Sequence, residues 1–179
     1  TLPTPDSAHR VGITAIHQET VLFDELSVTE NIFVGQYLYK GWLKKLDWPA
    51  MHQKAREILS RLDVQIDPRA ILKTLSIAQR HMVAIARALS FEAQVVILDE
   101  PTAALSQHEI LEFYQIVERL KLEGKAILFI SHKFDEIFEL ADHYTILRDG
   151  VYVGSGAINE ITEERMVAMM VGRAITQTY

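Results

Sequence analysis

Short apolar runs and helical stripes alternate along the chain and predict its elements. Residues 11–16 alternate apolar and small side chains as a short strand does, and the polar residues 17–20 end that pattern. Continuous apolar runs at 94–98 and 126–130 are typical of strands in a parallel sheet that is covered on both faces. The segment between those two runs carries a helical stripe made of Ile110, Tyr114, Val117 and Leu120. This order predicts a strand–helix–strand unit with parallel pairing.

Two helix starts are marked by polar residues at a fixed spacing. Ser76 is followed three residues later by Gln79, and Ser106 is followed by Glu109. In this capping box the serine and the later side chain each accept a backbone N–H that the first turn of a helix leaves without a partner. Helices are therefore predicted to begin directly after both serines, and Gly124 is expected to end the second of them.

Helical spacing also marks residues 27–62, most clearly at 50–62. This region contains the basic and aromatic stretch 41–49, which is either a solvated loop, the interpretation we favour, or a docking surface. The first ten residues, in contrast, are expected to form a loop.

Toward the C-terminus the pattern predicts a helix at 134–141, a hairpin and a final helix at 162–171. The hairpin strands, 143–147 and 151–155, flank an Asp-Gly pair at 149–150, a sequence that favours tight hairpin turns.

Composition limits the classes of function. The chain has 179 residues, of which 49% are hydrophobic and 23% charged, so it can bury a core and fold. Its formal net charge of -6 gives no sequence-wide basic field, so we expect no nucleic-acid partner. With no cysteine, it has neither disulfides nor thiolate metal ligands, which fits a reducing compartment. No apolar run approaches the roughly 20 residues that cross a bilayer, and no signal peptide is evident, so we expect any membrane role to be peripheral.

Four polar signals fall in one order along these elements. Gln18 follows the first strand, residues 75–79 open a helix, Asp99 and Glu100 end a strand, and His132 follows the next strand. A carboxylate at the end of a buried strand can hold Mg²⁺, and its neighbour can orient an attacking water. Taken alone, the Asp-Glu pair is more simply a polar strand end, and His132 a surface loop residue.

Together, these signals resemble the Q-loop, signature motif, Walker B motif and switch histidine of ATP-binding-cassette (ABC) ATPases, over residues 11–173. The resemblance implies an α/β fold: a P-loop NTPase-like core with a parallel sheet and an inserted α-helical subdomain, with the N-terminal P-loop part absent. It implies ATP and Mg²⁺ as cofactors, with Gln18 and Asp99 at the metal and with Glu100 and His132 as catalytic residues.

The signature segment has a structural and a functional interpretation. The capping box explains Ser76 and Gln79 without any ligand, yet a helix N-terminus also attracts anions. In the ABC family this segment, here Ser76, Ile77, Ala78 and Gln79, binds the γ-phosphate of ATP held by the opposite subunit. Ile77 and Ala78 replace the usual glycines, as in a variant similar to that of sugar importers. Ser106 stands where the D-loop of many relatives has aspartate, so it either contributes to the nucleotide site or serves only as a helix cap.

The P-loop itself is missing from the sequence, because none of the 8 glycines belongs to a G-x-x-x-x-G-K-[ST] string. That loop supplies the backbone N–H groups and the lysine that cradle phosphates. We expect that it was lost from the N-terminus and that the remaining chain is inactive alone. The alternative is a relative that naturally lacks the loop.

The segments 25–35, 47–51 and 169–173 look like the first half of double-cassette ATPases that energise bacterial ribose, xylose or galactose import. This resemblance implies coupling of ATP hydrolysis to monosaccharide uptake, in the cytoplasm on the inner face of the cell membrane. The implied partners are transmembrane permease subunits, a second cassette in the same or another chain and, indirectly, a periplasmic sugar-binding protein. Contacts to the permease are expected near residues 18–31, where the alternative is that Leu22, Phe23 and Leu26 are ordinary core residues.

The expected organisation is one truncated ABC ATPase domain with three parts: the end of the core sheet with the Q-loop at 1–26, the helical subdomain with the signature motif at 27–90, and the remaining core at 91–179. One alternative function is a non-catalytic interaction module that cannot bind ATP alone. Another is an ABC ATPase for a different substrate, and DNA repair or translation is disfavoured because no large coiled-coil or basic insertion is present.

Overall fold

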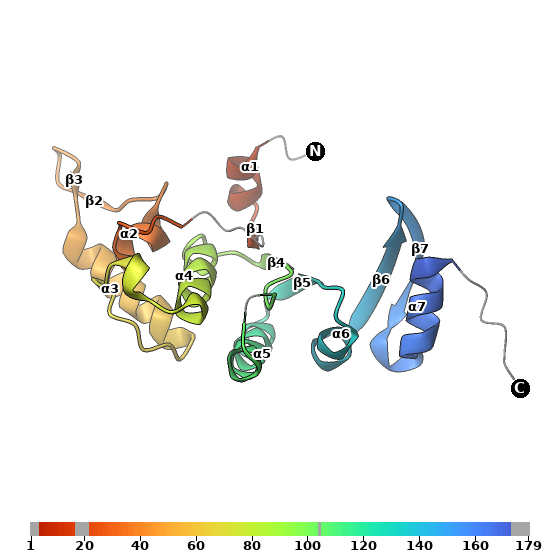
Figure 1. Cartoon of the computed structure of the whole chain (residues 1–179). Helices are drawn as coiled ribbons and strands as arrows, with labels where there is room; N and C mark the ends of the chain where they lie inside the picture. The colour runs from red at the N-terminus through yellow and green to blue at the C-terminus, as the bar shows by residue number, and fades with distance from the viewer. Residues whose placement is uncertain (1–3, 17–21, 104, 173–179) are drawn as a thin grey trace, which may run out of the picture. The chain divides into compact units, whose positions relative to one another are not determined.

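The computed structural model describes residues 4–16, 22–103 and 105–172. The chain separates into two compact units, Thr1–Ile130 and Ser131–Tyr179 (Figure 1). The boundaries predicted at residues 26 and 90 stay a prediction.

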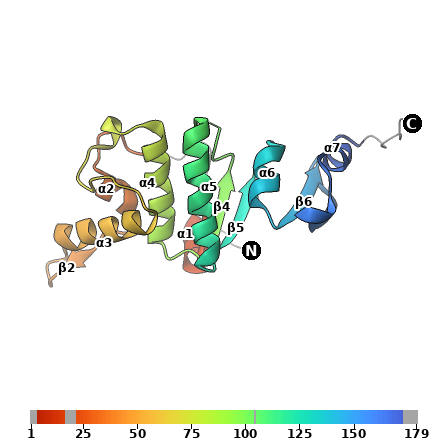
Figure 2. The ribbon, with the colours of Figure 1, turned by 90° about the horizontal axis from the view of Figure 1, so that it is seen from below.

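The first unit is built on a three-stranded parallel sheet in the order β1-β4-β5 (Figures 1 and 2). Its strands are β1 (Ile13–Ile16), β4 (Val95–Asp99) and β5 (Ala126–Ile130), and α5 (Gln107–Leu122) connects β4 to β5. The predicted strand–helix–strand unit is thus confirmed. In a parallel sheet the carboxyl ends of the strands share one edge, so β1, β4 and β5 all end at that edge.

The two faces of this sheet differ in burial. The register places Thr14, Val96 and Ile127 side by side, followed by Ile16, Leu98 and Phe129 one pleat further along. On this face Val96 and Leu98 are buried, whereas on the opposite face Leu128 is 53% and Ile130 46% exposed. The prediction of coverage on both faces is therefore wrong for β5, whereas no residue of β4 is exposed.

Three helices form the predicted helical block: α2 (Val28–Phe33), α3 (Trp48–Arg61) and α4 (Ile77–Ser90). They pack on one another around fully buried side chains that include Phe33, Met51, Leu59 and Val83. A small antiparallel hairpin, β2 (Tyr39–Lys40) and β3 (Lys45–Leu46), separates α2 from α3, and the 3₁₀ turn η1 (Leu72–Thr74) precedes α4.

The N-terminal segment forms a helix, α1 (Pro5–Arg10), where a loop was expected. Thr4 and Ser7 exchange side-chain and backbone hydrogen bonds in a capping box, and Pro5 occupies the first turn, where its missing N–H costs nothing. The ring of His9 then stacks on Phe91 with the centroids 4.0 Å apart. The helix is thus stabilised both by its local cap and by a contact with a residue distant along the chain.

The second unit contains α6 (Phe134–Leu140), the hairpin of β6 (His143–Arg148) and β7 (Val151–Ala157), the 3₁₀ turn η2 (Ile158–Glu160) and α7 (Glu163–Val171). The predicted hairpin is confirmed: Asp149 and Gly150 at its turn both have positive φ, 51° and 75°. Its small core consists of Ile146, Ile161 and Met166.

Candidate functional site

The carboxylates of Asp99 and Glu100 stand at the C-terminal end of β4. Asp99 is opposite Ile130 of β5, and the N–H of Glu100 donates to the Ile130 carbonyl at 2.9 Å. Glu100 has φ of +46°, a left-handed conformation that side chains other than glycine adopt at a cost. Such conformations persist where the surrounding structure enforces them, and they concentrate at functional sites. The hydrogen bond to β5 thus helps to fix the turn that carries Glu100.

The N-terminus of α4 carries the signature residues. Ser76 Oγ accepts the Gln79 N–H at 3.2 Å, and Gln79 Oε1 accepts the Ser76 N–H at 3.0 Å, so the predicted capping box is confirmed. Among the described residues, the N–H groups of Ile77 and Ala78 have no acceptor, and the Ile77 side chain is 57% exposed. The capped end of the helix therefore keeps two donors and its positive dipole end open to an anion.

His81 links the start of α4 to the turn after β4. Its ring hydrogen-bonds to the backbone of Pro101 and lies close enough to Glu109 to interact with its charge. Burial lowers the pKa of His81, and the carboxylate of Glu109 and the bond to Pro101 oppose that shift. The start of α4, with the signature residues, therefore lies at the same end of the first unit as Asp99 and Glu100. Sequence reasoning missed His81, because its partners Pro101 and Glu109 are distant along the chain.

Ser106 acts as a helix cap in this structure. Its N–H and its Oγ donate to Glu109 Oε2 at 2.8 and 2.7 Å, and its Oγ accepts the Glu109 N–H at 3.5 Å. The backbone hydrogen bond from Ser106, followed by that from its side chain, lowers the pKa of the Glu109 carboxyl. The capping interpretation is therefore confirmed, while a role of Ser106 at the nucleotide stays a prediction.

His132 belongs to the second unit, where it is exposed and follows β5 by two residues. The turn around it is well held: Ser131 Oγ accepts the Lys133 N–H at 3.0 Å and donates to Glu136 Oε2 at 3.1 Å. Lys133 Nζ also lies 3.1 Å from Glu136 Oε1. These bonds fix the backbone on both sides of His132, whose predicted contact with phosphate stays a prediction.

Gln18 lies outside the described residues, but the segment that follows it is organised by a buried amide that sequence reasoning did not single out. Asn31 Oδ1 accepts the Phe23 N–H at 2.7 Å, and Asn31 Nδ2 donates to the carbonyls of Phe23 and Ser27 at 3.0 Å. Asn31 is fully buried. It thereby closes residues 23–27 into a fixed loop at the start of α2.

The carboxylates of the described residues do not form a ready-made metal centre. Within residues 4–16, 22–103 and 105–172, no group of three or more histidine, aspartate or glutamate side chains could hold a metal ion. Mg²⁺ bound with a nucleotide requires only one or two carboxylates, because phosphates and water complete its octahedron. Asp99 therefore fits a cation that arrives with a nucleotide.

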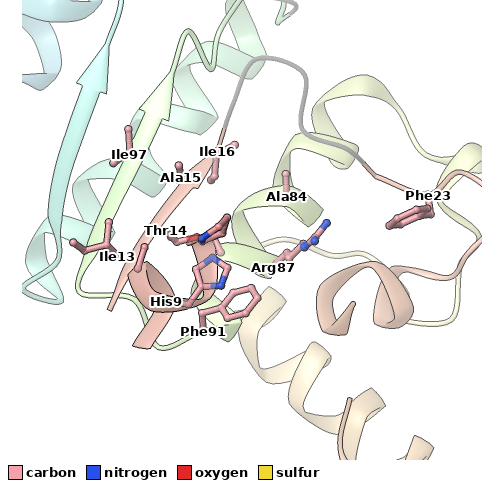
Figure 3. Close-up of a pocket in the computed structure, with 13 residues that line it drawn as sticks. His9, Ile13, Thr14, Ala15, Ile16, Phe23, Ala84, Arg87, Phe91 and Ile97 are labelled. Carbon is pink, nitrogen blue, oxygen red and sulfur yellow. The ribbon is translucent and has the colours of Figure 1, made fainter. Parts of the chain in front are cut away.

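A cavity of about 490 Å³ lies elsewhere in the first unit, lined by α1, β1 and the C-terminal half of α4 (Figure 3). Its walls are mostly apolar, with His9 and Arg87 as the basic groups. Burial lowers the pKa of Arg87, against the charge of Tyr37, yet a guanidinium stays protonated at neutral pH. Within the part of the chain that the structure describes, none of the predicted site residues lines this cavity.

Comparison with known proteins gives a family match for more than half of the chain. The family model described as "ABC transporter" matches residues 3–103. No helix in the described part of the chain is long and apolar enough to cross a membrane.

Similar sequences are named as sugar import proteins. A ribose import ATP-binding protein of Roseobacter denitrificans is 57% identical over 99% of this chain, and one of Rhizobium meliloti is 55% identical over all of it. A putative ribose/galactose/methyl galactoside import ATP-binding protein of Pseudomonas syringae is 41% identical over 98% of the chain. The chain spans only 35% of the length of the first two relatives.

Solved structures share the fold. A nucleotide-free ATP-binding cassette from an ABC transporter superposes with a TM-score of 0.75 at 23% identity, covering 97% of this chain and 70% of that one. A component of an ABC transporter complex from Clostridium perfringens gives a TM-score of 0.70 at 26% identity, over 93% of this chain and 65% of that one. The predicted α/β class is thus confirmed.

Proposed function

Because the chain belongs to the ABC transporter family, we propose that it forms part of an ATPase subunit that powers the import of a monosaccharide, with ribose the first candidate. The observation that carries this proposal is the identity of 55–57% with ribose import ATP-binding proteins along practically the whole chain. An unrelated function on the same fold would not require such similarity outside the motifs.

In this proposal Asp99 and Glu100 divide the work at the end of β4. Asp99 holds Mg²⁺, which neutralises charge on the phosphates of ATP. Glu100 accepts a hydrogen bond from the attacking water and orients it in line with the γ-phosphate. The support for this division is positional: the parallel sheet delivers both carboxylates to its carboxyl edge, and the left-handed turn of Glu100 is held by β5.

The signature residues Ser76–Gln79 bind the γ-phosphate of an ATP molecule held by a second cassette. The open N–H groups of Ile77 and Ala78 support this role. The capping box already holds them in place, so the backbone does not have to rearrange before they donate to a phosphate. His132 and Gln18 complete the assignment, His132 at the γ-phosphate and Gln18 at Mg²⁺ and the water.

The proposed setting is the cytoplasmic face of the cell membrane, with transmembrane permease subunits as direct partners and a periplasmic sugar-binding protein as an indirect one. The loop closed by Asn31 supports a permease contact, because Phe23 within it is 43% exposed while the backbone around it is fixed. A rigid loop with an exposed aromatic side chain is suited to transmit force between a nucleotide site and a partner.

A calorimetric titration with Mg-ATP tests the ATPase assignment. The 179 residues contain no G-x-x-x-x-G-K-[ST] string, so the titration uses the chain alone and a chimera in which the upstream segment of the Roseobacter relative precedes it. We expect micromolar binding by the chimera only. The chimera with Glu100→Gln should bind Mg-ATP equally well but release phosphate at least about 100-fold more slowly, since a positioned base speeds a reaction ~10²–10⁴-fold.

The same titration separates a second candidate function, a non-catalytic interaction module. Absent or millimolar binding by both proteins, with both shown to be folded by circular dichroism, would support the module and end the ATPase proposal. Binding without any effect of Glu100→Gln on phosphate release would leave the family intact but refute the assigned role of Glu100.

A further inference from the structure

The β2–β3 hairpin and its turn, residues 39–46, form a finger that leaves the helical block between α2 and α3 (Figures 1 and 2). Residues 39–45 are all exposed, and Trp42 at the turn is 91% exposed. Leu43 and Tyr39 are each more than half exposed. An almost fully exposed tryptophan beside an exposed leucine costs the isolated chain hydrophobic free energy, which makes this turn a candidate interaction surface.

The finger is a built element with a fixed turn. Gly41 and Lys44 both have positive φ, 66° and 48°, and the Lys44 N–H closes the turn on the Gly41 carbonyl at 3.2 Å. At its base the Asp47 N–H donates to the Leu38 carbonyl at 2.9 Å, while the Asp47 side chain caps α3. The start of α3 therefore holds the finger and presents its turn outward.

Three lysines surround the apolar turn. Lys40 Nζ lies 3.6 Å from Asp47 Oδ1 at the base. Within the described part of the chain, Lys44 and Lys45 form no ion pair with a carboxylate. The chain as a whole carries a net charge of -6, so these positive charges beside Trp42 are contrary to its general balance.

We propose that this finger is a membrane anchor that inserts Trp42 and Leu43 into the headgroup region of an anionic bilayer, with Lys44 and Lys45 against the lipid phosphates. Tryptophan prefers the membrane interface, lysine is attracted to anionic lipid, and its stem can lie along apolar surface while the ammonium stays at the phosphates. A convex turn of a few residues offers far less than the roughly 800 Å² per partner of a stable protein interface, but it is sufficient to enter a bilayer surface.

The intrinsic fluorescence of the chain reports directly on this anchor, because both of its tryptophans, Trp42 and Trp48, lie at the finger or its base. The variant Trp48→Phe leaves Trp42 as the only reporter. We expect the 179-residue variant to co-sediment with phosphatidylglycerol–phosphatidylcholine vesicles, with a blue shift of Trp42 emission. Vesicles of phosphatidylcholine alone should give neither effect, and added salt should weaken binding.

Finger variants and a matched control decide the assignment. Lys44→Glu with Lys45→Glu should weaken vesicle partition at least about thirtyfold, and Trp42→Ser at least about tenfold. The matched control, Arg69→Glu with Arg165→Glu, changes the net charge by the same amount at two exposed sites outside the finger. General charge repulsion should then weaken vesicle partition by less than about threefold.

No binding to anionic vesicles at low salt, or binding that the control pair and the finger pair weaken equally, would overturn the anchor. Unshifted Trp42 emission with bound vesicles would also overturn it, as would recruitment only by an acidic protein surface. No nucleotide is present in these assays, so their outcome does not depend on whether the ATPase proposal is correct.

Discussion

Replacing Asn31 with alanine tests whether one buried amide holds the loop that leads into α2. The Asn31 side chain accepts the Phe23 N–H and donates to the carbonyls of Phe23, Leu26 and Ser27, the longest of these bonds being 3.3 Å. Alanine removes all four bonds. What each lost bond costs depends on whether its former partner keeps another one.

The three carbonyls each keep a second donor. Phe23 O accepts the Leu26 N–H at 3.1 Å, Leu26 O accepts the Leu72 N–H at 3.0 Å, and Ser27 O accepts the Asn31 N–H at 2.9 Å. Only the Phe23 N–H is left without an acceptor. An orphaned, partly buried N–H costs ~1–3 kcal/mol, and the lost carbonyl bonds add a fraction of that, so we expect a loss of about 2–4 kcal/mol in the free energy of unfolding.

Urea unfolding monitored by tryptophan fluorescence gives the total, and hydrogen exchange of the Phe23 amide shows where the loss arises. That amide should lose its protection in Asn31→Ala. Asn31→Asp is the matched control, since it keeps an oxygen for the Phe23 N–H but puts a carboxylate against three carbonyls. It should destabilise the chain while the Phe23 amide stays protected. A loss below about 0.5 kcal/mol with unchanged Phe23 exchange would refute the reasoning.

Three further substitutions test other parts of the structure. Burial lowers the pKa of His81, so the folded chain binds fewer protons than the unfolded chain; stability is full above pH 6.5 and declines as the pH falls through the lowered pKa. His81→Gln should flatten that decline in urea midpoints measured from pH 7.5 to 5. Ser76→Asp keeps an N-cap acceptor but places negative charge at the open N–H groups. The thermal unfolding midpoint should therefore stay unchanged, while the ATP dependence of cassette dimerisation in the chimera should fall at least about tenfold. Leu128→Lys tests whether the exposed face of β5 lets two copies of the chain associate. We expect it to lower concentration-dependent association in sedimentation velocity more than Leu122→Lys on α5 does, and equal effects would exclude that face as the contact.

The elements that the sequence predicts well are those with a local physical cause. Both capping boxes, at Ser76 and Ser106, place the starts of α4 and α5 correctly because cap and partner lie three residues apart. The runs that become β4 and β5 are recognisable because strands in a parallel sheet are rich in apolar residues, and the Asp-Gly pair fixes the β6–β7 turn.

The features that sequence reasoning missed depend on partners distant along the chain. The role of His81 arises from Pro101 and Glu109, which lie some twenty or more residues further on, and no local pattern announces that approach. The exposure of Leu128 depends on what packs against β5, and the same apolar run would read identically if it were covered. Helix α1 is a different case, since its cap is local but the helix has only six residues.

The polar residues at the ends of the elements each allow a structural and a functional interpretation. The structure separates these two interpretations better at some of the residues than at others. At Ser106 the hydroxyl and the N–H are both engaged by Glu109, so capping accounts for the residue completely. At Ser76 the same motif engages the serine in the same way, and at both helix starts the next two N–H groups have no acceptor among the described residues, so this geometry does not separate the two serines. At Glu100 the backbone has φ of +46°, where glycine would be less strained, and such conformations concentrate at functional sites. The geometry therefore favours a functional role for Glu100 more than for either serine, and Glu100→Gln in the chimera is the most informative of the site substitutions.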